Sequence, residues 1–213
     1  MPRTLPTALL IVLLLLPSTS ASSGQTAQTL LLELRVFNGY EEVTNQTRVF
    51  LHRAGDRGTP VAEAGGGPPR IELKVDEGIY DVQAVRERDG QVVNIQWANR
   101  LVVMAYPDEA GRHLEVLNFR SGFGAHQIRA ADGSTPTVSI HEPSAATKEA
   151  AAAVGGAGYS LFVVPAGVYE LAVKRGDRPA VRHPQIEVPK DRTRLWLVPP
   201  DKQLSSEAAG DRP

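Results

Sequence analysis

The sequence predicts an all-β protein built from two tandem, small, antiparallel β-sandwich domains. One reason is a repeat: His52 and Tyr80 recur as His141 and Tyr169, each 89 positions later and within similar local sequence. A repeat of this length indicates two copies of one domain. The other reason is the alternation of apolar and polar residues, typical of strands that bury one face.

Short alternating stretches separated by turn residues occur throughout both copies, which favours two packed sheets in each. In the first copy the predicted strands are 30–37, 48–53, 71–75, 78–84, 92–97, 100–104 and 113–118. In the second copy they are 137–142, 159–164, 167–174, 184–188 and 193–198. Residues 76–78 are predicted to close a hairpin. The alanine-rich stretch 145–154 is predicted to be a helical turn or a loop.

The first 21 residues have the features of a signal peptide. Arg3 precedes the apolar run 8–16, and Thr19-Ser20-Ala21 offers the small residues of a cleavage site. The run is about half the ~20 residues of a membrane-spanning helix, although a permanent N-terminal anchor is the alternative. No later stretch is apolar enough to span a bilayer. Because arginine outnumbers lysine, as in GC-rich bacteria, we expect a bacterial protein that is periplasmic or secreted.

The predicted domain organisation places the boundary in a glycine-containing segment. The first sandwich is expected at residues 28–120 and the second at 129–199, with 121–128 as the linker. Gly122 and Gly124 suggest a hinge with few contacts across it. The tail, residues 200–213, lacks periodicity and is expected to be disordered.

Composition and motifs argue against several functions. The chain has no cysteine, which removes disulfides and thiol chemistry, and its net charge of −1 shows no basic cluster for nucleic acid. No hydrolase, P-loop or dinucleotide motif is present, and the five histidines follow no metal-ligand spacing. We therefore expect no enzyme activity, metal or cofactor, with an unrecognised hydrolase as the alternative. Arg175-Gly176-Asp177 is interpreted as a turn, and an adhesive tripeptide is its alternative.

Residues 164–173, Val-Pro-Ala-Gly-Val-Tyr-Glu-Leu-Ala-Val, resemble a Pro-x-Gly-x-Tyr-x-Leu-x-Val motif. That motif is found in bacterial PEGA-like and carboxypeptidase regulatory-like (transthyretin-like) modules. The resemblance implies an Ig-like or prealbumin-like sandwich used for scaffolding or recognition, and it carries over no active-site residue.

The motif also has a direct physical interpretation. Tyr80 and Tyr169 are predicted core anchors whose hydroxyls reach a nearby carbonyl, as in a tyrosine corner. Gly78 and Gly167 are predicted to permit a positive φ or a close approach of the chain. The alternative is that the tyrosines stack on a ligand.

The two tryptophans receive different predictions. The repeat aligns Trp196 with Glu115, so Trp196 is expected to face outward and, beside Arg194, to form a candidate binding surface. Its alternative is burial against the other domain or the tail. Trp97 shares a strand face with other apolar residues and is expected in the core.

These observations together predict an exported, non-catalytic protein that acts as a protein-interaction or cell-envelope binding or scaffold module. Its partner is expected to be a protein or an envelope component, with no nucleic acid and no integral membrane segment after signal removal. A tandem carbohydrate-binding module is the alternative, and it requires a surface aromatic platform.

Overall fold

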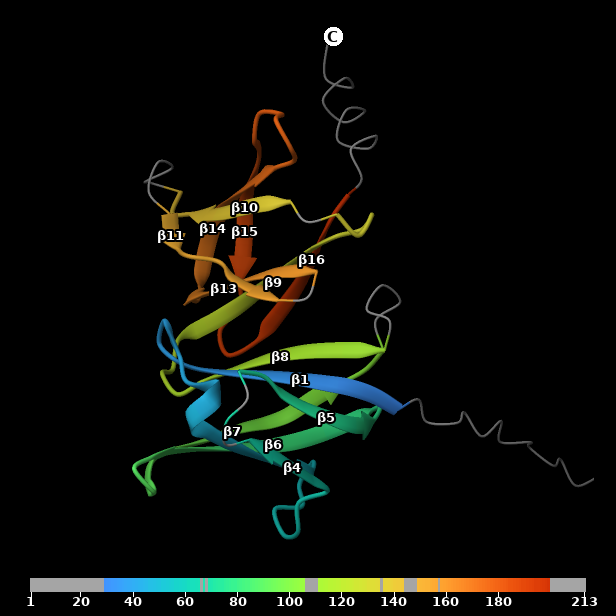
Figure 1. The fold of residues 1–213 in the computed structure, drawn as a ribbon, viewed down its shortest axis with the longest axis vertical. Helices are drawn as coiled ribbons and strands as arrows, with labels where there is room; N and C mark the ends of the chain where they lie inside the picture. Colours follow the sequence, from blue (N-terminus) through green and yellow to red (C-terminus); the bar gives the residue numbers. More distant parts are fainter. Residues whose placement is uncertain are drawn as a thin grey trace, which may run out of the picture.

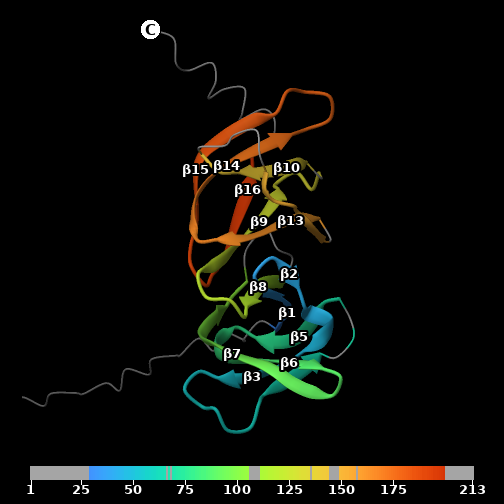
Figure 2. The same cartoon turned by 90° about the vertical axis from the view of Figure 1, so that its left-hand side faces the viewer.

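The fold is described by a computed structural model that covers residues 29–65, 67, 69–105, 111–134, 136–143, 149–156 and 158–199. Strands β1 to β8 form one β-sandwich and β9 to β16 form a second (Figure 1). The two sandwiches are stacked along the long axis of the molecule, as the perpendicular view also shows (Figure 2). In each, an interface sheet faces the other sandwich and an outer sheet faces away.

In the first sandwich, β1 is the central strand of the interface sheet. It pairs antiparallel with β2 and β5 and parallel with β8, while the outer sheet has the order β4-β3-β6-β7. The elements are β1 (Thr29–Asn38), β2 (Glu41–Glu42), the 3₁₀ helix η1 (Thr44–Gln46), β3 (Thr47–Arg53), β4 (Ala62–Gly65), β5 (Ile71–Asp76), β6 (Gly78–Arg88), β7 (Gln91–Val103) and β8 (Arg112–Asn118).

The second sandwich repeats this topology. Its interface sheet has the order β12-β13-β9-β16, its outer sheet the order β11-β10-β14-β15, and β9 again pairs parallel with the last strand. The strands are β9 (Phe123–Ala130), β10 (Thr137–His141), β11 (Glu149–Ala151), β12 (Val154–Gly156), β13 (Tyr159–Pro165), β14 (Gly167–Lys174), β15 (Val181–Val188) and β16 (Thr193–Val198). The prediction of two antiparallel β-sandwiches is confirmed.

Each sandwich has its own apolar core between its two sheets. The first is built around Leu32, Leu34, Leu51, Tyr80 and Val82, and the second around Ile140, Phe162, Val164, Tyr169 and Leu171. The repeat extends to an irregularity in the outer sheets. A bulge opposite Asp81 places Arg100 at φ 57°, and the matching bulge opposite Glu170 places Gln185 at φ 60°.

The tyrosine motif joins the two sheets of a sandwich. β5 pairs with β1, whereas β6 pairs with β3 and β7, so the predicted hairpin at residues 76–78 is wrong. Tyr80 is buried and its hydroxyl donates to the carbonyl of Asp76 at 2.7 Å. Tyr169 is buried in the same way and donates to the carbonyl of Pro165 at 2.7 Å. Burial raises the pKa of both phenols. A short turn predicts a hairpin only when the two strands are neighbours in one sheet.

The conserved place of glycine in this motif has a steric cause. Neither Gly78 nor Gly167 has a positive φ, so that expectation is wrong. Instead the tyrosine ring two residues later lies over each glycine, 3.4 Å and 3.6 Å from the place of a Cβ atom. These are ordinary van der Waals contacts, so the glycine gives the ring a flat surface to pack on.

The expected linker, residues 121–128, is largely a strand. β9 begins at Phe123 and is the first strand of the second sandwich, equivalent to β1. Glycine and polar residues hid it, yet Gly124 is required because a Cβ there would collide with the carbonyl oxygen of Pro189. Within the stretch expected to be a helical turn or loop, Glu149–Ala151 is strand β11.

The predicted signal peptide and the predicted disordered tail lie outside the described residues. Within the part of the chain that the structure covers, no helix has the length and apolar character needed to cross a membrane.

Candidate functional site

The two sandwiches share a buried interface, which is where the expectation of few contacts fails. A third apolar cluster lies between the interface sheets, formed by Phe37, Leu114, Ala125, Tyr159, Leu161 and Val163. Phe37 and Leu161 are both 0% exposed. These strands therefore bury both faces, one in their own sandwich and one against the other sandwich. Burial on this scale holds the sandwiches together through the hydrophobic effect.

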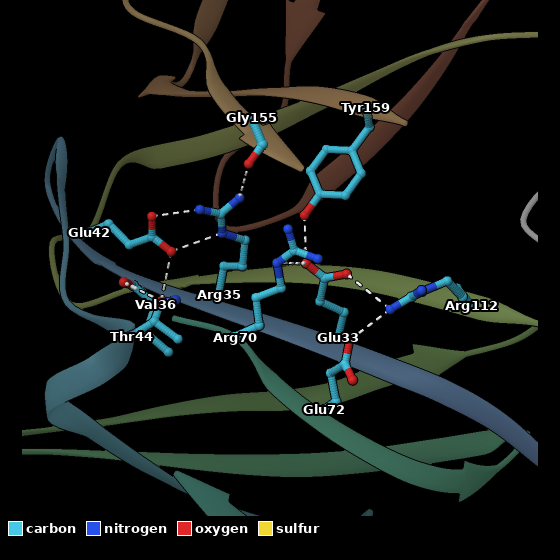
Figure 3. Close-up of polar contacts among 10 residues, drawn as sticks. All are labelled: Glu33, Arg35, Val36, Glu42, Thr44, Arg70, Glu72, Arg112, Gly155 and Tyr159. Atoms are coloured by element: carbon cyan, nitrogen blue, oxygen red, sulfur yellow. Dashed lines mark hydrogen bonds and ion pairs between the residues drawn. The ribbon is translucent and has the colours of Figure 1, made fainter. Parts of the chain in front are cut away.

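Polar side chains lock the same interface (Figure 3). The hydroxyl of Tyr159 in the second sandwich donates to the buried carboxylate of Glu33 in the first at 2.5 Å. Burial, together with this bond to Glu33, raises the pKa of Tyr159 to about 12. Arg70 and Arg112 lie 4.0 Å and 3.9 Å from the Glu33 carboxylate.

Arg35 makes the second polar connection. Its guanidinium donates two hydrogen bonds to Glu42, at 2.8 Å and 2.6 Å, and a third to the carbonyl of Gly155 in the second sandwich at 3.1 Å. A buried ion pair is tolerated when its remaining hydrogen-bonding groups are satisfied. Glu33 and Arg35 thus serve the interface, and their arrangement provides no open position for a substrate.

Trp196 does not face outward. It pairs in register with Ile128 and packs against the core of the second sandwich, where its ring meets His183 edge-on at 4.8 Å. The alignment with Glu115 holds, since Glu115 also lies on the inner side of its sheet, 3.2 Å from His113. The error came from Leu195 and Leu197, whose apolar face was taken as the only buried face of the strand.

Arg194 remains at the surface, with its side chain 56% exposed and 3.9 Å from Glu187. Because Trp196 contacts the core, these two residues do not form a joint aromatic and cationic surface.

Trp97 lies where Trp196 was expected, on the solvent side of a sheet. It belongs to β7 and faces away from the first core, together with Phe50 and His52 of β3. The guanidinium of Arg57 lies 4.5 Å from the centre of the Trp97 ring and donates to Asn99 at 2.7 Å. The prediction that Trp97 is in the core is wrong, because the apolar face of β7 is open to solvent.

This surface is here named the distal patch and is defined by residues of β3, β6 and β7: Phe50, Ile79, Ile95, Trp97 and Val102. Ile79, Ile95 and Val102 are 43%, 51% and 47% exposed. His52 lies beneath its edge, 4% exposed and 5.4 Å from the Trp97 ring. Within the described residues neither ring nitrogen of His52 has a hydrogen-bond partner.

The same face of the second sandwich is different. Ser139 and Arg182 take the places of Phe50 and Trp97, as the strand registers show. Ser139 shares a hydrogen bond with His141 at 2.8 Å, and Arg182 pairs with Glu170. The aromatic surface therefore belongs to the first copy alone and is not required by the fold.

A groove of about 460 Å³ adjoins the distal patch. One wall is the edge of β7, residues 96–102, and another is the edge of β8, residues 115–118. The second sandwich closes it with Phe123, Gly124 and residues 191–193. The groove thus lies along an open side of the first sandwich, next to the interface.

Other candidate sites from the sequence have structural roles. No group of three or more histidine, aspartate or glutamate side chains arranged to hold a metal occurs among the described residues. In the Arg175-Gly176-Asp177 turn, Arg175 is 12% exposed and binds Asp132 at 2.8 Å and the carbonyl of Pro199 at 2.9 Å. That arginine is therefore not presented as an adhesive tripeptide requires.

Sequence reasoning missed the distal patch and the polar interface. Bulky residues on both faces of 48–53, with Phe50 and His52 opposite the core residues, could have indicated a second packed or binding face. Glu33 and Arg35, charged residues inside the most apolar strand, could have indicated a buried contact between the domains.

No protein-family model matches the chain, and no curated protein matches its sequence. Distant similarity is found to three bacterial structures. The truncated tip fimbrial protein Mfa3 of Porphyromonas gingivalis is 8% identical with a TM-score of 0.31, over 82% of this chain and 96% of that one. The minor pilin GBS52 of Streptococcus agalactiae is 10% identical with a TM-score of 0.26, over 80% and 94%.

The third is the TIE protein of Bacillus anthracis, 14% identical with a TM-score of 0.29 over 80% of this chain. The present chain spans only 34% of that protein's length. The description of the fold therefore rests on the strands and registers given above.

Proposed function

We propose that this chain is an exported, non-catalytic β-sandwich protein that binds another protein or an envelope component. The distal patch carries the proposal, because monomeric soluble proteins rarely leave a contiguous apolar surface without a function. Aromatic residues and arginine, here Trp97 with Arg57, are the residue types enriched where proteins bind each other. The matching surface of the second copy supports this, since it folds without the aromatic residues.

In this proposal the second sandwich acts as a scaffold. The apolar interface, with Glu33, Arg35 and Tyr159, holds it rigidly behind the first sandwich. The distal patch then lies at one end of the molecule, away from the second sandwich (Figure 1). The predicted signal peptide would place the protein in the periplasm or outside the cell.

The test is photo-cross-linking in the cell envelope. A benzophenone amino acid replaces Ile95 in the distal patch, and in a control chain it replaces Val168 on the outer sheet of the second sandwich. Both side chains are 51% exposed, so their intrinsic chance of contact is matched. A protein adduct at position 95 that is absent at position 168 is expected. Equal adducts at both positions, or none at either, would contradict the proposal.

Carbohydrate binding is the second candidate, and Trp97 favours it. A tryptophan on an open sheet face beside the buried, unpaired ring of His52 offers a stacking surface and a hydrogen-bonding group. Arg57 covers that ring, so a sugar would have to displace it. Binding of the full chain to an array of bacterial glycans, abolished by Trp97→Ala and strengthened by Arg57→Ala, would favour this function. Absence of glycan binding in all three proteins would exclude it.

A further inference from the structure

We propose that the free edge of β7 binds an extended segment of the partner protein as an added β-strand. This inference rests on the proposed function and names the form of the partner. β7 is the terminal strand of its sheet and pairs only with β6 in the described part of the chain. An unpaired edge presents a row of amide and carbonyl groups that another strand can pair with.

The edge of β7 lacks the features that prevent such pairing. Proteins protect edges by short strands, charged side chains, proline and bulges. β7 is 13 residues long, and residues 91–99 contain neither a charged residue nor a proline. Bulges interrupt it only near its ends, around residue 93 and at residues 99–100, and leave 94–98 regularly paired with β6.

The other terminal strands in the described residues are protected. β2, β4, β11 and β12 have four residues or fewer, and β5, β8, β15 and β16 each carry charged side chains. β15 is the counterpart of β7 in the second copy, and it contains Arg182, Pro184 and Glu187 within eight residues. The same fold thus has a protected edge in one copy and an unprotected edge in the other.

The groove selects a single extended segment. It follows the edge of β7 over residues 96–102, a length of about 23 Å for a strand. Phe123 and residues 191–193 of the second sandwich stand on its far side. A second copy of this chain, pairing through a whole sheet, would meet that wall, whereas one extended strand fits between the walls.

The side chains around the edge define the chemistry of the segment. Alternate residues of an added strand point to opposite faces of the sheet. One set would continue the distal patch beside Ile95 and Trp97, so these residues should be apolar or aromatic. The other set would enter the groove near Glu115 and Arg192, so these should be polar or charged. The partner segment is therefore an alternating apolar and polar strand.

The experiment uses the full chain and a display library of random twelve-residue peptides. Selected peptides are synthesised, and amide hydrogen exchange is measured on the full chain with and without each peptide. Alternating peptides that slow exchange within residues 94–102 are expected. N-methylation of alternate peptide amides should weaken binding about tenfold or more, because main-chain hydrogen bonds are lost.

Two matched variants separate the edge from the apolar face. Gln96→Lys places a charge on the edge and should weaken peptide binding about tenfold. Ile79→Lys changes the distal patch on β6, which is not an edge strand, and should leave the affinity nearly unchanged. Failure to select any binding peptide, protection elsewhere than on β7, or equal losses in both variants would each overturn the inference. A partner cross-linked at position 95 would still support the proposed function in any of those cases.

Discussion

Replacement of His126 by leucine should remove a specific acid sensitivity of this protein. His126 lies on the inner side of β9, 2% exposed, and within the described residues neither ring nitrogen has a hydrogen-bond partner. Desolvation by burial, and to a lesser extent the charge of Arg194, lowers its pKa from 6.5 to about 4. The strand registers make Leu32 its counterpart in the first copy, so leucine is compatible with this position in the fold.

The magnitude follows from the difference in pKa between the folded and unfolded chains. Above about pH 6.5 the imidazole is neutral in both states, and its contribution to the free energy of unfolding is constant. Below that pH the unfolded chain takes up a proton that the folded chain does not accept until about pH 4. With about 1.4 kcal/mol for each pKa unit, His126 should lower the free energy of unfolding by about 3 kcal/mol between these two pH values.

The assay is urea denaturation of the wild type and His126→Leu at a series of pH values from 7 to 4, with an NMR titration of the His126 ring. Taking the difference between the two proteins cancels the titration of other groups. The variant should be at least as stable as the wild type at pH 7, because it no longer buries two unsatisfied nitrogens. Its advantage should grow by about 3 kcal/mol toward pH 4. Parallel stability curves, or a His126 pKa near 6.5, would refute the reasoning.

Three further outcomes test the interface and the tyrosine motif. Tyr159→Phe should lower the unfolding free energy by about 1.5–3 kcal/mol, the value of a hydrogen bond to the charged Glu33; an unchanged melting temperature would contradict this. Gly124→Ala should destabilise by several kcal/mol through collision with a backbone carbonyl, whereas the control Gly155→Ala, where a Cβ meets nothing within 4 Å, should not. Equal thermal melts for the two alanine variants would argue against the steric reason. Tyr169→Ala should cost about 3–5 kcal/mol and Tyr169→Phe about 0.5–1.5 kcal/mol by urea denaturation, and similar losses for both would remove the role of the hydroxyl.

The strands that bury one face were predictable from the sequence. Residues 167–174 and 193–198 were predicted with the bounds they have in the structure, because alternation and flanking turn residues mark such strands. The repeat also predicted two copies of one fold. β9 was missed because its inner face holds Gly124 and His126, so it lacks the apolar alternation on which the method depends.

The faces of strands were harder to predict than their positions. A strand residue is assigned to the core when its neighbours at every second position are apolar, and this assumes a single apolar face. β8 and β16 have apolar residues toward the other sandwich as well as toward their own. β7 has apolar residues toward solvent. Trp196 and Trp97 were exchanged between surface and core for that reason, since no local pattern states which of two apolar faces meets water.

The internal repeat makes it possible to separate what the fold needs from what one copy adds. Positions that agree between the copies, such as Tyr80 with Tyr169 and the two bulges, serve folding. Positions that differ without changing the fold are free to serve binding. Phe50 and Trp97 against Ser139 and Arg182 form one such difference, and the unprotected edge of β7 against β15 forms another. Both lie on the outer sheet of the first sandwich. This coincidence on one sheet is why we place the binding function there rather than at the interface, where every buried charge already has a partner.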